Sequence, residues 1–247
     1  MKILGLDFET TGLDPLKDEI IEVGAVLWDT ERNIPLKIIS EIIKGEIQIS
    51  KEIQELTKIS NDDRENYGVS QSKLAFILAD FIYDCDYIIA HNAKFDKSFS
   101  DAFINNIQGK SGDLLDIAFS NFEKPWIDSM TDIDYAFSNS KKLSYLAADH
   151  GFINPFAHRA VFDVLTMLKL AAMYDWNETI ENSKEPKIDI TAVVSFENKD
   201  AAKSLGYHWI DRSWKKQIRK SKFEDESKKA REKGFKILGE DIWKGIK

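Results

Sequence analysis

The sequence is poor in cysteine, with Cys85 as the only one among its 247 residues. A single cysteine excludes an intramolecular disulfide, so a reducing compartment such as the cytoplasm is expected. Long apolar runs are also lacking, because no stretch approaches the ~18–20 apolar residues that a membrane span needs. Asp7 and Glu9 interrupt the apolar run that an N-terminal signal peptide would require. The sequence therefore predicts a cytoplasmic protein with no membrane partner.

Positive charge is scarce overall, because 34 Lys and Arg residues face 42 Asp and Glu residues and the formal net charge is −8. This balance gives no sign of a nucleic-acid binder. The charge is unevenly spread, however. Residues 189–247 carry a net charge of +5, which leaves −13 for residues 1–188. An acidic body followed by a basic segment indicates two parts with different surfaces.

The apolar pattern of the acidic part predicts a mixed α/β sheet. Strands are expected at 2–8, 20–29 and 34–43, and their short connections make them antiparallel neighbours. Helices and strands then alternate, which is typical of a sheet flanked by helices. The expected order is a helix from Ser70, a strand at 86–90, a helix at 96–107, a strand at 126–130, and helices at 141–151 and 160–174.

The stretch LGLDFETTGLD places Asp7 and Glu9 inside an apolar strand. Strand side chains alternate, so these two carboxylates share one face while Leu6 and Phe8 share the other. Buried carboxylates are costly unless a cation or a metal compensates them. The spacing alone decides nothing, because the chain contains other acidic pairs two residues apart. Asp7 and Glu9 are therefore either functional or a strand-end pair that faces solvent.

Two further stretches place a carboxylate near the start of a helix. AHNAKFDKSF contains Asp96, which is either a site residue or a simple N-cap. AHRAVFDVLTML contains Asp163 among apolar residues, where a charge is costly unless it lies on an exposed edge of the helix. His158 and Asp163 would lie about 140° apart on one helix, so His158 is expected on the preceding loop.

The motifs DFETTGL, HNAKFD and HRAVFD, in this order, resemble those of the DEDDh exonucleases, the DnaQ-like and RNase T-like 3′→5′ exonuclease family. The resemblance covers about residues 1–175 and implies a ribonuclease H-like mixed β-sheet flanked by helices. It also implies an enzyme that shortens single-stranded DNA or RNA from the 3′ end and releases nucleoside 5′-monophosphates. A catalytically inactive protein that binds nucleic-acid ends on the same fold is the alternative, and the complete set of five key residues argues against it.

By this resemblance, two Mg²⁺ or Mn²⁺ ions would be held by Asp7, Glu9, Asp96 and Asp163. Oxygen ligands suit these ions better than zinc. His158 would be the general base that takes a proton from the attacking water, whereas a hydrogen-bonded structural role suits His91 and a helix C-cap suits His150. The pocket for the terminal nucleotide would be lined by Thr10, Thr11, Leu13, Asn92 and Phe95, although a turn with core packing explains Thr11 and Leu13 equally well, and core packing explains Phe95.

The expected domains are 1–176, a polar linker at 177–188 that contains Pro186, and a small basic α+β module at 189–247. In the module, AAKSLGYHWIDRSWKKQIRK predicts a short helix and a two-strand hairpin, and it resembles a module found beside phage and bacterial nuclease-like domains. Basic residues interleaved with aromatic ones suit single-stranded nucleic acid. The alternative is that Tyr207, Trp209 and Trp214 form the small core of the module.

Overall fold

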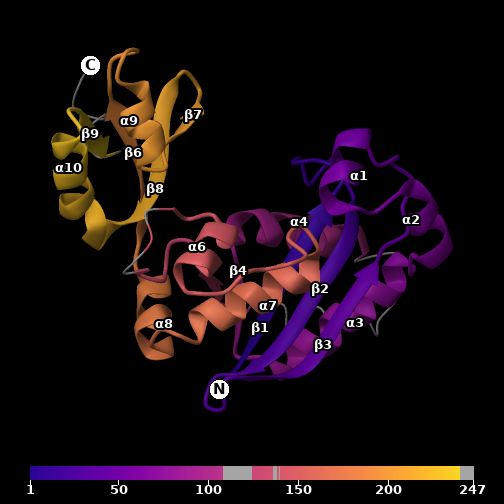
Figure 1. The fold of residues 1–247 in the computed structure, drawn as a ribbon. Helices are drawn as coiled ribbons and strands as arrows, with labels where there is room; N and C mark the ends of the chain where they lie inside the picture. Colours follow the sequence, from indigo (N-terminus) through magenta and orange to yellow (C-terminus); the bar gives the residue numbers. More distant parts are fainter. Residues whose placement is uncertain (108–123, 136–137, 139, 240–247) are drawn as a thin grey trace.

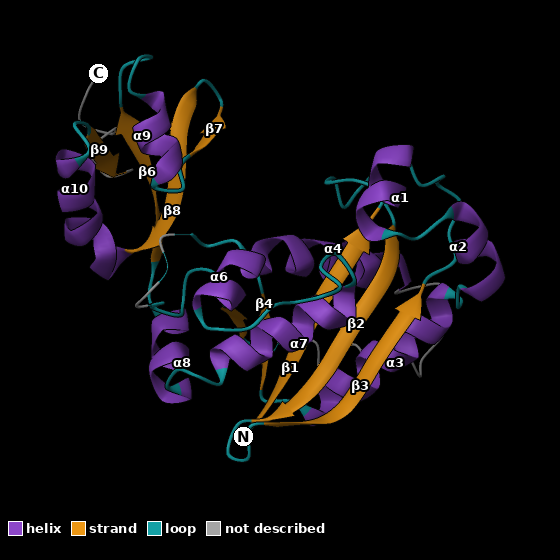
Figure 2. Cartoon of the chain, viewed as in Figure 1, coloured by secondary structure: helices purple, strands orange, loops and turns teal. Residues whose placement is uncertain are grey.

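The computed structural model describes residues 1–107, 124–135, 138 and 140–239 (Figure 1). The end of the predicted C-terminal module, 240–247, lies outside the described residues. The described chain forms two β-sheets, each accompanied by helices (Figure 2). Across the described residues, no helix is both long enough and apolar enough to cross a membrane.

The first sheet has five strands in the order β3-β2-β1-β4-β5. These strands are β1 (Lys2–Thr10), β2 (Ile20–Asp29), β3 (Ile34–Ile42), β4 (Tyr87–Ala90) and β5 (Trp126–Asp128). β1, β2 and β3 pair antiparallel, whereas β4 pairs parallel with both β1 and β5. The predicted mixed sheet is confirmed.

The described helices around this sheet are α1 (Lys51–Thr57), α2 (Asn61–Tyr67), α3 (Gln71–Asp84), α4 (Ala93–Ile107), α6 (Leu143–Asp149), α7 (Ala160–Ala171) and α8 (Trp176–Lys184). The sequence did not predict α1 and α2. Both begin after a serine whose side chain accepts a backbone N–H, Ser50 and Ser60. Each helix is only two turns long, and such short segments carry little periodicity to recognise.

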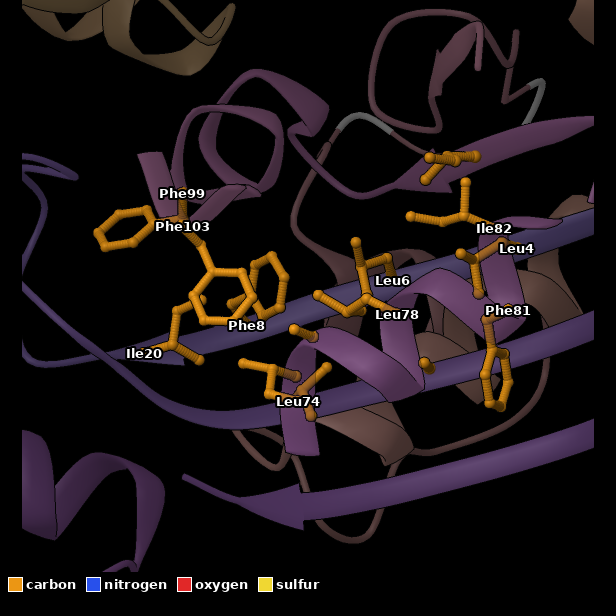
Figure 3. Packing of buried hydrophobic residues seen from close by; sticks show 14 of the residues in the cluster. Leu4, Leu6, Phe8, Ile20, Leu74, Leu78, Phe81, Ile82, Phe99 and Phe103 are labelled. Atoms are coloured by element: carbon orange, nitrogen blue, oxygen red, sulfur yellow. The ribbon is translucent and has the colours of Figure 1, made fainter. Parts of the chain in front are cut away.

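Alternation along β1 divides its residues between two cores. The apolar even-numbered residues pack against α3 and α4, as Figure 3 shows for Leu4, Leu6 and Phe8. The odd-numbered residues face α7, and Ile3 is buried there with Val164 and Leu168. Asp7 and Glu9 lie on the α7 face by the same alternation. β1 therefore contributes an apolar side to one core and a carboxylate pair to the other face.

Helix α7 approaches the sheet at two glycines. A Cβ atom on Gly24 of β2 would lie 2.3 Å from the backbone carbonyl carbon of Ala160, at the start of α7. A Cβ atom on Gly5 of β1 would lie 2.7 Å from Cγ1 of Val164. Only a residue without a side chain allows this contact, so the two glycines set the distance between α7 and the carboxylates of β1.

The polar stretch 177–188, which was expected to be a linker, is partly helical in the structure. Its first part is the helix α8, which begins at an Asp175 N-cap whose carboxylate accepts the N–H groups of Asn177 and Glu178. Trp176 and Ile180 are buried in the core beneath α7. The polar residues occupy the outer side of the helix, which explains why the stretch resembles a linker.

The C-terminal module is a four-stranded antiparallel sheet in the order β7-β8-β6-β9. Its elements are β6 (Lys187–Val193), α9 (Lys199–Ser204), β7 (His208–Ile210), β8 (Ser213–Arg219), the short 3₁₀ helix η1 (Lys220–Lys222), α10 (Phe223–Glu232) and β9 (Lys236–Gly239). The predicted short helix and hairpin are α9, β7 and β8. The sequence did not predict the flanking strands β6 and β9.

The prediction for the aromatic core of the module was partly wrong. Tyr207 is buried beside Phe235, as expected for a core residue, and Trp214 is partly buried. Trp209, however, is 60% exposed. β6 and β9 supply apolar residues such as Ile190 and Ile237, so the core is complete without Trp209.

We expect Gly24→Ala to lower the thermal midpoint more than Gly5→Ala. The new Cβ at position 24 meets backbone, which cannot move aside without displacing α7, whereas the Cβ at position 5 meets the side chains of Val164 and Leu168. Overpacking of side chains costs about 1–3 kcal/mol, and each kcal/mol corresponds to roughly 2–4 °C for a chain of this size. Calorimetry of both variants tests the order. A Gly24→Ala protein as stable as wild type would contradict the close contact.

Candidate active site

The carboxyl end of β1 carries the first two carboxylates. Asp7 and Glu9 are half-buried and lie on the face that α7 covers. The register of β1 against β2 shifts between Glu9 and Thr10, so the regular strand pairing ends there. The pair therefore lies where the sheet opens into the turn that follows.

Helix α4 adds a third carboxylate, Asp96, in its first turn. Asp96 is only 2% exposed and its Oδ1 accepts the backbone N–H of Phe8 at 3.0 Å. The N-cap alternative is wrong, because α4 begins at Ala93 and Asp96 lies inside the helix. Its hydrogen bond to β1 instead fixes the start of α4 beside Asp7.

Helix α7 and the loop before it add Asp163 and His158. Asp163 is half-buried, and its carboxylate accepts the backbone N–H of His158 at 2.9 Å and the side-chain amide of Asn154 at 2.6 Å. His158 is exposed and precedes α7, as predicted, with a left-handed φ of 65°. Ligand atoms of Glu9, His158 and Asp163 all lie within 4.8 Å of one another. The three sequence motifs thus converge at one end of β1.

The carboxylates raise one another's pKa values. Burial is the main cause for Asp7, and the charges of Asp96, Glu9 and Asp163 raise its pKa further. Burial together with the charges of Asp163 and Glu22 raises the pKa of Glu9 to about 8. Burial also raises the pKa values of Asp96 and Asp163. Because the four groups act on one another, they form a single cluster of negative charge.

The chemistry of this cluster fits divalent cations. Four carboxylates from three elements offer only oxygen ligands, which Mg²⁺ and Mn²⁺ prefer. Their pKa values are raised first by burial and then by neighbouring negative charges that the chain compensates only in part. A bound cation would compensate that charge. Asp7, Glu9, Asp96 and Asp163 are therefore the residues that could hold a metal here.

The residues predicted to line a nucleotide pocket occupy different environments. Thr10 is buried and its hydroxyl donates to the carbonyl of Gly12 at 2.6 Å, whereas the hydroxyl of Thr11 donates to Asp18 at 3.2 Å. Both side chains thus stabilise the turn after β1. Leu13 in the same turn is 84% exposed, so core packing does not explain it.

The other two predicted pocket residues flank the start of α4. Asn92 is exposed, has a left-handed φ of 75°, and its N–H donates to Asp128 at 3.1 Å. Phe95 is half-buried in the α4 core, with its ring 4.9 Å from that of Phe99. Core packing therefore explains Phe95, and its remaining exposed part is what a ligand could touch.

Known proteins share sequence features with this chain. A sequence model of the RNase T exonuclease family matches residues 4–171. The chain belongs to this exonuclease family. It is 32% identical over 225 residues to the PolC-type DNA polymerase III of Thermotoga petrophila. This alignment covers 81% of this chain and 15% of that protein. It is 32% identical over 173 residues to the 3′–5′ exonuclease DinG of Staphylococcus saprophyticus. This alignment covers 67% of this chain and 17% of that protein. The chain thus spans less than a fifth of either relative.

Solved structures share the fold of this exonuclease-family chain at low sequence identity. Escherichia coli exonuclease I in complex with a dT13 oligonucleotide aligns with a TM-score of 0.58 and 18% identity over 70% of this chain and 40% of that one. The nuclease domain of 3′hExo, a DEDDh family member bound to rAMP, aligns with a TM-score of 0.55 and 19% identity. The alignment covers 70% of this chain and 90% of that one. The predicted ribonuclease H-like fold of the DEDDh exonucleases is confirmed.

Two histidines of the exonuclease domain lie outside the carboxylate cluster, as predicted. His91 is held through both ring nitrogens, by the hydroxyl of Ser129 at 2.8 Å and the carbonyl of Lys141 at 2.7 Å. His150 is the C-cap residue of α6 and contacts the hydroxyl of Tyr174 at 2.6 Å. Their hydrogen bonds explain both residues without a role in chemistry.

Sequence reasoning missed Glu22 and Arg159, which adjoin the cluster. Glu22 is fully buried, lies opposite Glu9 in the register of β1 and β2, and forms an ion pair with Arg159. The sequence did offer one signal. A single carboxylate within the apolar stretch IIEVGAV is expected to be buried, and a buried carboxylate requires a partner. The partner itself is distant in sequence and could not be identified from the pattern.

The metal-free domain should become less stable as the pH rises from about 5 to about 8. Because the pKa of Glu9 is about 8 in the folded protein and 4.5 ordinarily, the folded chain retains a proton that the unfolded chain has released. Rising pH therefore favours unfolding in this window. Glu9→Gln should lose less thermal stability between pH 5 and pH 8 in EDTA than wild type, and Mn²⁺ should stabilise wild type more than the variant.

The exposed Glu55→Gln is the matched control, because it removes one carboxylate from the exposed surface of α1. Its thermal midpoint should follow wild type across the pH range. An equal pH dependence for wild type and Glu9→Gln would refute the raised pKa of Glu9.

Proposed function

We propose that this chain is a two-metal 3′→5′ exonuclease that acts on the 3′ end of single-stranded DNA or RNA and releases nucleoside 5′-monophosphates. The observation that carries the proposal is the convergence of four carboxylates beside one exposed histidine at the end of β1. A complete set of five groups favours an enzyme over an inactive protein that only binds nucleic-acid ends.

Asp7, Glu9, Asp96 and Asp163 would hold the two cations. When bound, such ions neutralise charge on the phosphate and lower the pKa of a coordinated water. The chain contributes the placement of the ligands: β1 fixes two of them, and the Asp96 hydrogen bond to the N–H of Phe8 fixes the third. Asp163 is oriented by the Asn154 amide and by the backbone of His158.

His158 is the proposed general base. Its ring is exposed and close to Glu9 and Asp163, so it can reach a water beside the cluster. Histidine is the side chain that most often serves as a general base in enzymes. Proton transfer of this kind contributes about 10²–10⁴ to a rate. Because the Asp163 carboxylate holds the backbone of His158, the base and one ligand are positioned together.

The terminal nucleotide would bind next to the cluster, against the turn after β1 and the start of α4. The exposed side chain of Leu13 offers an apolar surface for a base or sugar. Thr10 and Thr11 hold the turn in place through their hydroxyls. Asn92 and the exposed part of Phe95 would form the opposite wall.

The relatives support both nucleic acids as candidate substrates. Exonuclease I was solved with a DNA oligonucleotide, and 3′hExo was solved with rAMP. Single-stranded DNA and RNA are therefore both proposed substrates.

We expect metal-dependent shortening of a 5′-labelled single strand from its 3′ end, tested with DNA and RNA of one sequence. EDTA and Asp7→Ala should each abolish cleavage, and His158→Ala should slow it by about 10²–10⁴. Asp101→Ala, on the exposed side of α4, is the matched control and should cut at the wild-type rate. Binding without cleavage by wild type would favour the inactive end-binding protein. A wild-type rate for His158→Ala would remove the proposed base.

We further propose that the module at 189–247 binds single-stranded nucleic acid. Trp209 is 60% exposed and packs edge-on against Trp214, with ring centroids 5.5 Å apart. Phe196 is 77% exposed, and the Lys199 ammonium lies 4.0 Å from its ring centroid. Exposed aromatic rings next to cations, on a segment with a net charge of +5, suit bases that stack and phosphates that need neutralising.

Trp209→Ala should weaken the binding of a long single strand by about 1–3 kcal/mol, or roughly 5- to 150-fold, because one stacked base loses its partner. Cleavage of an oligonucleotide too short to reach the module should stay unchanged. Tyr83→Ala is the control, since Tyr83 is 75% exposed on α3, outside the module. Fluorescence anisotropy of labelled oligonucleotides measures both effects. Equal affinities for wild type and Trp209→Ala would rule out stacking on Trp209.

A further inference from the structure

Glu22 is a buried carboxylate that the proposed mechanism does not use. It is fully buried on β2, opposite Glu9. Its Oε1 accepts the Nη2 N–H of Arg159 at 2.8 Å and the Nε N–H at 3.1 Å. Its Oε2 accepts the same Nε N–H at 3.2 Å and the backbone N–H of Ala160 at 3.0 Å. The hydroxyl of Ser40 completes the set at 3.3 Å. All these contacts lead to the start of α7 or to the neighbouring strand.

The Ala160 contact makes Glu22 the cap of α7 from outside the helix. Arg159 is the N-cap residue and makes no side-chain cap hydrogen bond of its own. The first N–H groups of a helix lack partners within it, and a carboxylate there is favoured by the helix dipole. Glu22 supplies this carboxylate from β2, so the start of α7 is tied to the sheet.

The same contacts constrain His158, which directly precedes Arg159. The backbone of His158 has a left-handed φ of 65°, which costs free energy for a residue with a side chain. The segment 158–160 is held at one end by Asp163, through the N–H of His158, and at the other end by Glu22. This segment carries the His158 ring, which has a nitrogen within 4.8 Å of a carboxylate oxygen of Glu9.

We infer that Glu22 and Arg159 are positioning residues that hold the His158 segment in the geometry needed for proton transfer. The inference rests on the proposed function of His158 as general base. Glu22 and Arg159 touch neither the reacting atoms nor, in this role, the nucleic acid. Both residues also carry charges that act on the pKa of Glu9, and Arg159→Lys keeps that positive charge while it removes the guanidinium geometry.

A direct contact between Arg159 and a substrate phosphate is the competing explanation. Three hydrogen bonds engage the guanidinium with Glu22, and its side chain is 34% exposed. A positioning residue affects kcat and acts together with its partner. A phosphate-binding residue affects KM and acts independently of Glu22. The two roles therefore give opposite results in steady-state kinetics.

The test compares Glu22→Gln, Arg159→Lys and the double variant with wild type. Each single variant should lower kcat about 10- to 100-fold, as loss of an orienting partner does elsewhere, while KM changes by less than about twofold. The double variant should be no slower than the slower single variant, because the two residues act as a unit. If Arg159→Lys raises KM while Glu22→Gln keeps the wild-type kcat and KM, the inference is overturned in favour of phosphate binding.

Arg64→Lys controls for the general effect of breaking a buried ion pair. Arg64 is 4% exposed and donates to Glu19 at 2.8 Å and to the carbonyls of Ile20, Ile43 and Ile47, rather than to the His158 segment. It should lose thermal stability and keep kcat. An equal fall of kcat in Arg64→Lys and Arg159→Lys would overturn the inference, because destabilisation alone would then explain the loss.

Hydrogen exchange tests the positioning without any activity. In Glu22→Gln and Arg159→Lys, a peptide covering 155–162 should exchange faster than in wild type, whereas Arg64→Lys should leave that peptide unchanged. Unchanged exchange in all variants would refute the inference even if cleavage is lost. If wild type proves inactive but the exchange pattern is as expected, the proposed function is wrong. Glu22 and Arg159 would still hold the segment 158–160 in place.

Discussion

The contact between α7 and the antiparallel strands is the constraint on which the rest of the candidate site depends. Gly24 allows the backbone of Ala160 to approach β2, and Gly5 allows Val164 to approach β1. Any side chain at these positions would lift α7 away from the sheet. Asp163 and His158 would then move away from Glu9, to which only α7 and its preceding loop bring them close. Two residues without side chains thus determine the distances among those that carry the chemistry.

This close packing brings like charges together, and the fold compensates them only in part. Asp96 receives the N–H of Phe8, and the charge of Arg159 lowers the pKa of Glu9, yet the pKa values of the cluster remain raised. The apolar cores on both faces of the sheet hold these groups in place against their repulsion. An unfavourable charge arrangement maintained by packing is what a cation-binding site requires before the cation arrives.

The sequence predicted the sheet and the identity of the clustered residues better than it predicted the parts that support them. Alternation along β1 is a local signal, so the faces of Asp7 and Glu9 followed from spacing alone. The helix α8 was missed because Trp176 and Ile180 are too few to reveal which face is buried. Pairing of Glu22 with a residue of α7 depends on packing between segments far apart in the chain, which no local pattern contains.

The junction between the two sheets bears on how the module would act. Only Glu185 and Pro186 separate α8 from β6, and the Lys187 ammonium bonds Asp132 at 3.0 Å. Arg219 of β8 has a nearly buried side chain paired with Asp134. Removing Asp134 would leave the buried guanidinium with the Glu185 carboxylate, 3.9 Å away, as its remaining acidic partner.

The module is therefore attached in one orientation rather than on a loose tether. In Figure 1 its edge strand β7 lies on the side of α1 and α4, and α10 lies on the other side. Under the proposed function, a single strand that stacks on β7 would meet a module held in one orientation by these ion pairs. The ion pairs at the junction thus have the same role for the module that Glu22 has for α7.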